Sequence, residues 1–156
     1  MTEQEFIQQA EGLKGRLYRT AWLYLGSEAC AVDAVDEAVY QGFLHYKRLR
    51  QPEYFATWMT RILINACNAE LRRRKRELAV AAAARDRGGG LRRAPPAGRP
   101  GPHACPRELR AVVVLRYFQG LTLAETAQAL DIPPGTVSTR QRKALSLLKL
   151  HLTEEV

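Results

Sequence analysis

Apolar side chains recur every three or four positions along residues 1–70, which is the spacing of one face of an α-helix. A first helix is expected to end at Gly26, and its apolar stripe consists of Leu13, Leu17, Ala21 and Leu25. Ser27 is a suitable N-cap for a second helix, whose stripe consists of Val32, Val35, Val39 and Phe43. Pro52 lies near the start of a third helix, whose stripe consists of Phe55, Met59, Ile62, Ala66 and Ala69.

The composition changes abruptly between about Arg85 and Pro106. This stretch is rich in glycine, proline and arginine and cannot supply a core, so we expect a flexible linker there. The alanine-rich run at residues 79–84 either extends the third helix or frays. Since no strand pattern is present, the sequence predicts an all-α fold. Two small helical domains, at residues 1–78 and 106–156, are joined by a linker at residues 79–105.

Helical periodicity resumes after the linker, in a segment that ends at Gly120. Thr122 and Glu125 have the spacing of a capping box, which predicts a short helix running to about Leu130. A longer helix is expected over about 136–152, after a turn. Asp131 stands in that turn, at a position where glycine is common, and Asp tolerates the left-handed conformation better than most residues.

The two C-terminal helices have the spacing of a helix-turn-helix. Ala127 is small enough for a close helix crossing, and Val137, ten residues later, is placed to pack back under the first helix. The second helix carries short polar and cationic side chains suited to a DNA major groove. A plain helical hairpin with a solvated basic face is the alternative, but the capping box, the small crossing residue and the cationic helix together favour DNA binding.

The charge distribution divides the chain. The net charge is +8, but residues 1–70 carry a net −2 and residues 71–156 a net +10. A strongly cationic half attracts a polyanion, either nucleic acid or an anionic membrane surface. The first half has no such attraction, and we expect it to have a different partner.

Several classes of protein are not indicated. No signal peptide and no apolar run long enough to span a bilayer is present, so we expect a cytoplasmic protein without direct membrane insertion. The cysteines Cys30, Cys67 and Cys105 have neither disulfide nor zinc spacing, and His103 beside Cys105 is far short of a metal site. We expect no metal and no cofactor.

Five stretches in order resemble the extracytoplasmic-function (ECF) branch of the sigma-70 family of RNA polymerase sigma factors. Segment 31–39 is similar to the family's acidic polymerase-binding helix, segment 55–65 to its promoter-melting segment and segment 71–76 to the basic end of that segment. Segments 115–122 and 132–140 are similar to the domain that binds the −35 element. The resemblance implies that residues 1–78 are sigma region 2 and residues 106–156 are sigma region 4.

The resemblance also implies three sets of site residues. The residues expected to contact core RNA polymerase are Asp33, Val35, Asp36, Glu37 and Tyr40. Those expected to contact the −10 element are Phe55, Trp58, Arg61, Asn65, Asn68, Arg72, Arg73, Arg74 and Arg76. Those expected to contact the −35 element are Thr122, Thr136, Ser138, Thr139, Arg140, Arg142 and Lys143.

Two of these assignments have an ordinary alternative. Taken alone, the acidic helix face is better interpreted as an ordinary solvated face, although no basic residue lies between Arg19 and Lys47 to neutralise it. Trp58 is spaced to lie in the core, whereas the family reading places it against unstacked bases, where stacking contributes about 1–3 kcal/mol per base.

The function implied is that of a sigma factor, which binds core RNA polymerase, reads −35 and −10 promoter elements and assists melting. Its expected partners are core RNA polymerase, promoter DNA and an anti-sigma factor, often membrane-anchored in this family; the free protein is expected to be a monomer. One competing function is an operator-binding dimer, which needs an apolar association surface that the sequence does not show. Another is an enzyme, for which neither a nucleophile motif nor a phosphate loop is present, so we expect no catalysis.

Overall fold

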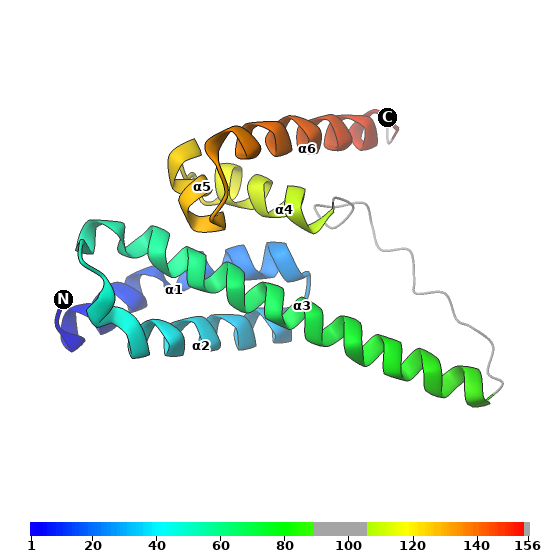
Figure 1. The fold of residues 1–156 in the computed structure, drawn as a ribbon, viewed down its shortest axis with the longest axis horizontal. Helices are drawn as coiled ribbons and strands as arrows, with labels where there is room; N and C mark the ends of the chain where they lie inside the picture. The colour runs from blue at the N-terminus through cyan, green and yellow to red at the C-terminus, as the bar shows by residue number, and fades with distance from the viewer. Residues whose placement is uncertain (89–105, 155–156) are drawn as a thin grey trace.

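The computed structural model describes residues 1–88 and 106–154, and its regular elements are all helical (Figure 1). The N-terminal half consists of α1 (Glu3–Leu25), α2 (Glu28–His45) and α3 (Phe55–Gly88), with 3₁₀ turns η1 (Tyr46–Arg48) and η2 (Pro52–Tyr54) before α3. The C-terminal half consists of α4 (Arg107–Val113), a π-helical turn η4 (Val114–Phe118), α5 (Leu123–Leu130) and α6 (Pro134–Glu154). The all-α prediction is confirmed.

Local capping sets the ends of the first helices. The Thr2 hydroxyl accepts from the Glu5 backbone N–H at 3.2 Å while the Glu5 carboxylate accepts from the Thr2 N–H at 2.8 Å, so α1 begins with a capping box. Gly26 ends α1 with φ of 71°, a left-handed conformation that favours glycine. Ser27 caps α2, as predicted.

The core of the N-terminal domain lies between α1, α2 and α3. The predicted stripe of α1 is confirmed, since all four of its residues are buried. The predicted stripe of α2 is only partly right. Val35 is buried and Val39 packs against the core, but Val32 and Phe43 are 42% and 40% exposed. The buried face consists of Ala31, Ala34, Val35, Ala38 and Gly42. Small residues let α2 approach its neighbours closely, and a Cβ on Gly42 would lie 2.7 Å from the Met59 sulfur.

The predicted stripe of α3 is only partly right. Phe55 and Met59 are buried, but the buried face then continues through Leu63 and Cys67 instead of Ala66 and Ala69. The stripe differs because α3 packs on two sides. One side contacts α1 and α2, and Ile64 faces the C-terminal domain.

Helix α3 is longer than the sequence indicated. It continues through the alanine-rich run to Gly88, so the first part of the stretch assigned to the linker is helical, and it projects beyond the bundle (Figure 1). Leu78 and Val80, on this extension, are each 70% exposed. The rest of the linker, residues 89–105, lies outside the described residues, and so do His103 and Cys105.

The helix-turn-helix prediction agrees with the structure in its local geometry. Thr122 and Glu125 form the predicted capping box, with backbone-to-side-chain distances of 3.3 and 3.2 Å. Asp131 adopts φ of 56°, the left-handed turn conformation. Ala127 and Val137 pack together with Val112 in a buried cluster, while α6 begins at Pro134, slightly before its expected start.

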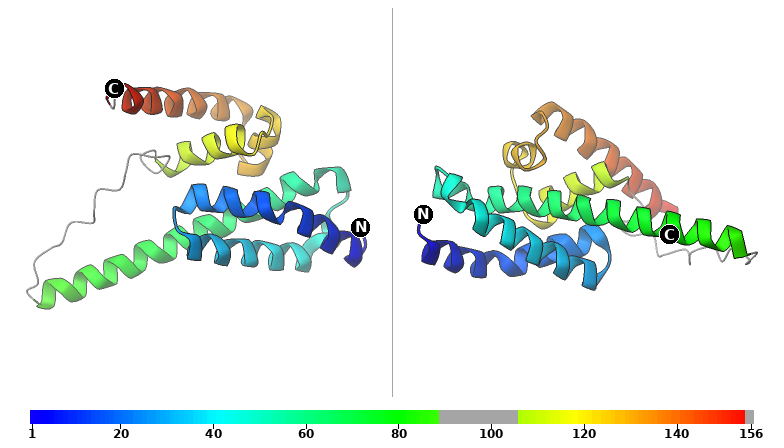
Figure 2. Two further views of the ribbon diagram at one scale, coloured as in Figure 1. Left: turned by 180° about the vertical axis from the view of Figure 1, so that it is seen from behind. Right: turned by 60° about the horizontal axis from the view of Figure 1, so that its bottom comes forward.

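The C-terminal domain lies against the N-terminal domain. Helix α5 and the turn η4 pack on α3 and α1, and α6 lies on the outer side (Figure 2). Ile64 of α3 shares an apolar cluster with Leu115, Leu121 and Ala129 of the C-terminal domain. The two halves therefore form one closed arrangement.

Candidate nucleic-acid and polymerase-binding surfaces

An acidic face occupies the exposed side of α2. Asp33, Asp36, Glu37 and Tyr40 follow one another at spacings of three residues or fewer, lie on one face of the helix and are all exposed. Tyr40 is 57% exposed, and Leu44, one turn later, is 53% exposed. The face is thus acidic at its start and apolar at its end, a combination suited to a basic protein surface with apolar contacts.

Two features of this face differ from the sequence expectation. Val35 is only 2% exposed and belongs to the core, so it supports α2 from inside instead of offering a contact. In addition, α3 brings a basic group near the acidic face. The pKa of Arg73 is raised above its usual value, mainly by a hydrogen bond to the Glu70 carboxylate and by the charge of Glu70, with smaller contributions from Glu77 and Asp33.

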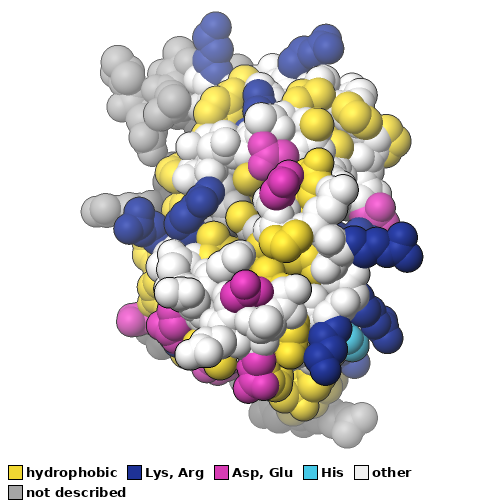
Figure 3. All heavy atoms as spheres, turned by 90° about the vertical axis from the view of Figure 1, so that its left-hand side faces the viewer, with side chains coloured by type: hydrophobic (Ala, Val, Ile, Leu, Met, Phe, Trp, Pro, Cys, Tyr) yellow, Lys and Arg dark blue, Asp and Glu magenta, His cyan; other side chains and the backbone are white. Residues whose placement is uncertain are grey.

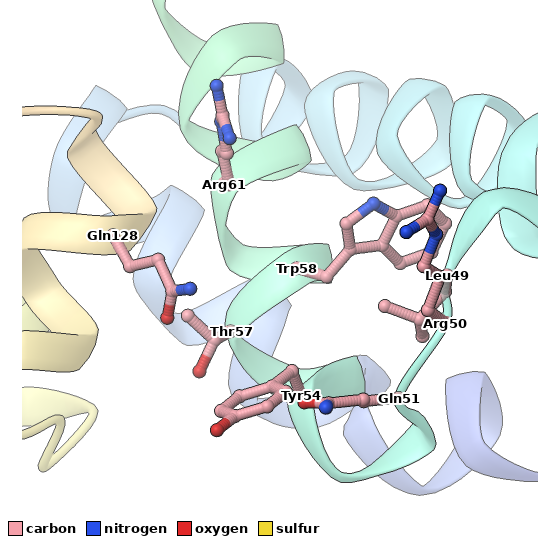
Figure 4. Close-up of a pocket in the computed structure, with 8 residues that line it drawn as sticks. All are labelled: Leu49, Arg50, Gln51, Tyr54, Thr57, Trp58, Arg61 and Gln128. Carbon is pink, nitrogen blue, oxygen red and sulfur yellow. The ribbon is translucent and has the colours of Figure 1, made fainter.

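A pocket of about 300 Å³ lies at the start of α3. Trp58, Tyr54 and Arg61 line it together with the loop residues before α3, and the side chain of Gln128 on α5 points toward Thr57 (Figure 4). Trp58 is half-buried and its ring centroid lies 6.1 Å from that of Phe55. An aromatic ring with one side in the core and the other in a cation-lined pocket can stack on a flat ligand.

The structure does not give all predicted −10 residues a free surface. Phe55 is 4% exposed and lies in the core against Phe6, so it positions Trp58 and has no face of its own for DNA. Asn68 accepts a hydrogen bond from the Tyr24 hydroxyl at 2.6 Å. Arg74 donates to the Leu25 carbonyl at 3.3 Å, at the C-terminal end of α1.

The remaining −10 candidates are exposed. Arg61 and Asn65 lie one turn apart on α3, and Arg72 and Arg76 stand on the projecting part of that helix. Arg73 is also exposed but pairs with Glu70. The sequence missed Arg50 and Tyr54, although Tyr54 lies four residues before Trp58, a spacing that could have indicated one aromatic cluster.

The second helix of the helix-turn-helix has an exposed cationic side. Arg142 and Lys143 are exposed on α6, and so is Thr139, whose hydroxyl donates to the Gly135 carbonyl at 3.0 Å. Ser138 and Thr136 are partly buried. Arg140 differs from the rest: its guanidinium lies 3.8 Å from the Glu108 carboxylate and faces the N-terminal domain.

The end of the molecule formed by α5 and the start of α3 carries both signs of charge. In Figure 3, acidic side chains lie among apolar ones between basic side chains at the margins. The +10 charge of residues 71–156 is therefore not gathered on this end. In the closed arrangement, the cationic groups of α6 and of the projecting part of α3 belong to separate surfaces.

Comparisons with known proteins identify the family. A family model described as Sigma-70 region 2 matches residues 10–77, and one described as Sigma-70, region 4 matches residues 106–150. The ECF RNA polymerase sigma factor SigM of Mycobacterium tuberculosis is 31% identical over 137 residues, covering 85% of this chain and 69% of that protein. The chain belongs to the ECF sigma factors of the sigma-70 family.

Another relative matches most of the sequence. The RNA polymerase sigma factor SigV of Bacillus subtilis is 26% identical over 152 residues, covering 91% of this chain and 87% of that protein. Two solved structures share the fold. The sigma factor RpoE in complex with the anti-sigma factor NepR from Bartonella quintana has a TM-score of 0.76 and 18% identity, covering 96% of this chain and 98% of that chain. CnrH in complex with the cytosolic domain of CnrY has a TM-score of 0.74 and 20% identity, covering 99% of this chain and 92% of that chain.

This sigma factor accordingly acts with RNA polymerase in promoter-specific transcription initiation, and sigma factors are initiation regulators, not catalysts. Both domains of the family are present in the family's order. Among the described residues, no helix is long and apolar enough to cross a membrane.

Proposed function

We propose that this sigma factor contacts core RNA polymerase through the acidic face of α2, the −10 element through the start of α3 and the −35 element through α6. The observation that carries the proposal is the separation of exposed side chains by chemistry. Carboxylates and Tyr40 gather on α2, an aromatic and cationic pocket opens at α3, and exposed polar and cationic groups lie at Thr139, Arg142 and Lys143 of α6.

The α2 face suits a protein partner better than DNA. Three exposed carboxylates on one helix face repel phosphate, and the exposed Tyr40 and Leu44 beside them add apolar area for a partner to bury. A basic surface of the polymerase would complement both. Asp33, Asp36 and Glu37 supply the charge and Tyr40 the apolar contact.

The pocket at α3 suits one unstacked base of the −10 element. Trp58 offers a ring face, Tyr54 a second ring, and Arg50 and Arg61 cationic groups for the adjacent phosphates (Figure 4). Such a pocket binds a base only after it has left the duplex, so it stabilises the melted state relative to the paired one. Arg72, Arg73 and Arg76 further along α3 would add salt-sensitive phosphate contacts.

Helix α6 suits the major groove at the −35 element. Arg142 and Lys143 are exposed and long enough to reach base edges or phosphates, and Ser138 and Thr139 add short polar groups on the same helix. Thr122 caps α5 and is exposed at its start, where a helix N-terminus favours a phosphate. Thr136, which is partly buried near the start of α6, would contribute a further polar contact to the −35 element.

An anti-sigma factor is also proposed as a partner. The support is the similarity, over nearly the whole chain, to two sigma factors whose structures were determined with NepR and with the cytosolic domain of CnrY. Residues 1–78 and 106–156 are proposed as the two domains, with a linker between them, on the basis of the two family models that match residues 10–77 and 106–150.

Run-off transcription with core polymerase tests the proposed function, with start sites mapped on genomic promoter fragments. We expect defined start sites only when this sigma factor and core are both present. As controls, a triple variant of α2 (Asp33→Asn, Asp36→Asn, Glu37→Gln) should lose core binding while keeping its helical circular dichroism. Specific binding to a promoter duplex without core, at the affinity of the holoenzyme, would instead support the operator-binding alternative.

A further inference from the structure

A polar pocket of about 440 Å³ lies between the two domains. Its lining residues come from α1, α3, α4, α5 and α6, so both domains are needed to form it. It is separate from the pocket that Trp58 lines, although Arg61 borders both. Small-molecule sites in proteins have volumes of roughly 300–1,000 Å³, so this pocket has room for a whole small molecule.

Three arginines bring positive charge to this pocket. Arg61 comes from α3, Arg107 from the start of α4 and Arg140 from α6. Arg107 is exposed and makes no hydrogen bond or ion pair with any residue that the structure describes. Burial raises the pKa of Tyr24 to about 12, and the nearby charge of Arg107 opposes this rise, so the guanidinium lies close to the Tyr24 side of the pocket. A guanidinium without a partner readily binds phosphate oxygens, often two at once.

The other two arginines are held only loosely. Arg61 lies 3.4 Å from the Asp131 carboxylate, and Arg140 lies 3.8 Å from that of Glu108. Both distances are longer than the roughly 2.7–2.9 Å of a charge-assisted hydrogen bond. The two carboxylates are 79% and 72% exposed, and ion pairs so exposed contribute little. A phosphate group can therefore displace both carboxylates, which turn into solvent at little cost.

Two asparagines of α3 add amide groups on the same side of that helix. Asn68 accepts a hydrogen bond from the Tyr24 hydroxyl at 2.6 Å, which holds its side-chain oxygen and leaves the amide N–H groups for another acceptor. Asn65, three residues earlier, is exposed, and its side chain has no hydrogen-bond partner within the described part of the chain. Carboxamides of this kind pair with the edges of nucleobases.

One side of the pocket is apolar. Ile64 and Ala129 line it and belong to the interdomain cluster of Ile64, Leu115, Leu121 and Ala129, which we term the Ile64 seam. Ile64 and Ala129 are only 3% and 2% exposed, so they open little apolar area to the pocket. The lining is thus mainly cationic and amide-bearing, which suits a phosphorylated ligand better than an apolar one.

We propose that this pocket binds a nucleoside polyphosphate, with its phosphates on Arg107 and Arg140 and its base on Asn65. The arginines select the oligophosphate group, while the size of the pocket and its carboxamides favour a nucleotide over pyrophosphate. Because the lining comes from both domains, the ligand binds only when they are packed together. Arg61, Asn65 and Arg140 are also proposed to contact the promoter, so ligand and promoter compete for them; this consequence rests on the proposed function.

Isothermal titration of the full-length protein tests the site. ATP, GTP, inorganic pyrophosphate and adenosine are each titrated at about 0.15 M salt without divalent cations, so that the phosphates keep their full charge. We expect a single saturable site for ATP or GTP, weaker binding of pyrophosphate and no binding of adenosine. Pyrophosphate bound as tightly as both nucleotides would overturn the choice of a nucleotide. Adenosine bound as tightly as ATP, or no saturable binding of any probe, would overturn the site.

Substitutions in each domain test whether the site lies between the domains. Asn65→Asp places a carboxylate in the pocket from α3 and should weaken nucleotide binding at least about tenfold. Arg107→Ala removes a guanidinium from α4 and should weaken it about tenfold. Gln8→Glu makes the same charge change as Asn65→Asp at an exposed position that lines no part of the pocket, and should leave the affinity unchanged. Because all three positions are exposed, each variant should unfold at the unsubstituted temperature without ligand.

The pattern of losses decides where the ligand binds. A loss with Arg107→Ala but not with Asn65→Asp would place the ligand on the C-terminal domain alone and overturn an interdomain site. The exposed Arg142 and Lys143 of α6 also attract phosphate. The double variant Arg142→Ala, Lys143→Ala should nevertheless keep the ATP affinity within about twofold, because salt screens exposed charges outside the pocket. A loss as large as that of Arg107→Ala would mean binding to the exposed side of α6 and would overturn the proposal.

Open-complex formation separates this inference from the proposed function. ATP added before core polymerase should slow open-complex formation by the unsubstituted protein more than by Arg107→Ala. Core polymerase is the same in both reactions, and Arg107 is not among the proposed promoter contacts. Equal slowing would overturn the competition between ligand and promoter. If neither protein forms a promoter-specific open complex with core, the proposed function fails, whatever the titrations show.

Discussion

Trp58 provides the sharpest test of how the −10 element is held. Trp58→Ala removes the ring face from the pocket that Tyr54 and Arg61 also line. Base–aromatic stacking contributes about 1–3 kcal/mol per base, so the open complex should weaken by roughly 5- to 150-fold. Trp58→Phe keeps a ring and should recover most of this loss.

The Trp58→Ala result must be corrected for any loss of fold stability. Trp58 is half-buried against Phe55, so its truncation removes core contacts as well as a stacking surface. Trp22, the other tryptophan of the chain, is 48% exposed on α1 and lines no part of this pocket. Trp22→Ala is therefore the matched control and should leave open-complex stability unchanged, while thermal unfolding reports the structural cost of each variant.

The assay is a double-mutant cycle between protein and DNA. Open-complex lifetimes are measured on promoters that carry a single abasic site at successive positions of the melted strand. At one position, removing the base should make the open-complex lifetimes of Trp58→Ala and the unsubstituted protein equal, because the base on which Trp58 stacks is gone. If the difference persists at every position, or if Trp22→Ala shows the same loss, Trp58 does not hold a base and its role is in the core.

Three further predictions concern other parts of the chain. Arg142→Ala should reduce preference for one −35 sequence by about 1–3 kcal/mol if the contact is to a base edge, measured by competition between promoters; equal loss on all sequences would mean a phosphate contact. Thr122→Ala removes the N-cap of α5 and should lower the free energy of unfolding by about 1 kcal/mol in urea titrations, whereas Thr122→Ser should not. Burial raises the pKa values of Cys67 and Tyr24 to about 12, so these groups ionise first in the unfolded chain; stability should fall as the pH rises from their unfolded values towards 12, and unchanged unfolding midpoints there would contradict this.

The sequence predicted those features that depend on neighbouring residues. The Thr122 and Glu125 capping box, the left-handed Asp131 and the end of α1 at Gly26 each follow from contacts within a few positions. The packing of Ala127 under Val137 was also predictable, because helix-turn-helix geometry fixes a ten-residue spacing. Local chemistry determines these positions almost independently of the rest of the fold.

The faces of α2 and α3 were harder to predict because their neighbours decide them. On α2, the alanines and Gly42 face the core although larger apolar residues such as Val32 were available, since only small side chains allow close helix approach. On α3, Ile64 is buried by a domain more than 40 residues away in sequence. Nothing in the periodicity of a single helix shows that it will be covered on a second side.

The polar network between the domains has the least visible sequence signal and a clear physical consequence. The side-chain amide of Gln119 donates to the Thr20 hydroxyl of α1 at 2.9 Å, and its side-chain oxygen accepts from the Thr60 hydroxyl of α3 at 3.2 Å. The hydroxyls of Thr20 and Thr60 also lie 2.8 and 2.7 Å from the carbonyls of Arg16 and Ala56, one turn earlier in their own helices. When the domains separate, both hydroxyls keep these partners and Gln119 is hydrated, so opening leaves few polar groups unsatisfied. The polar contacts therefore set the position of docking, and the Ile64 seam supplies most of its free energy.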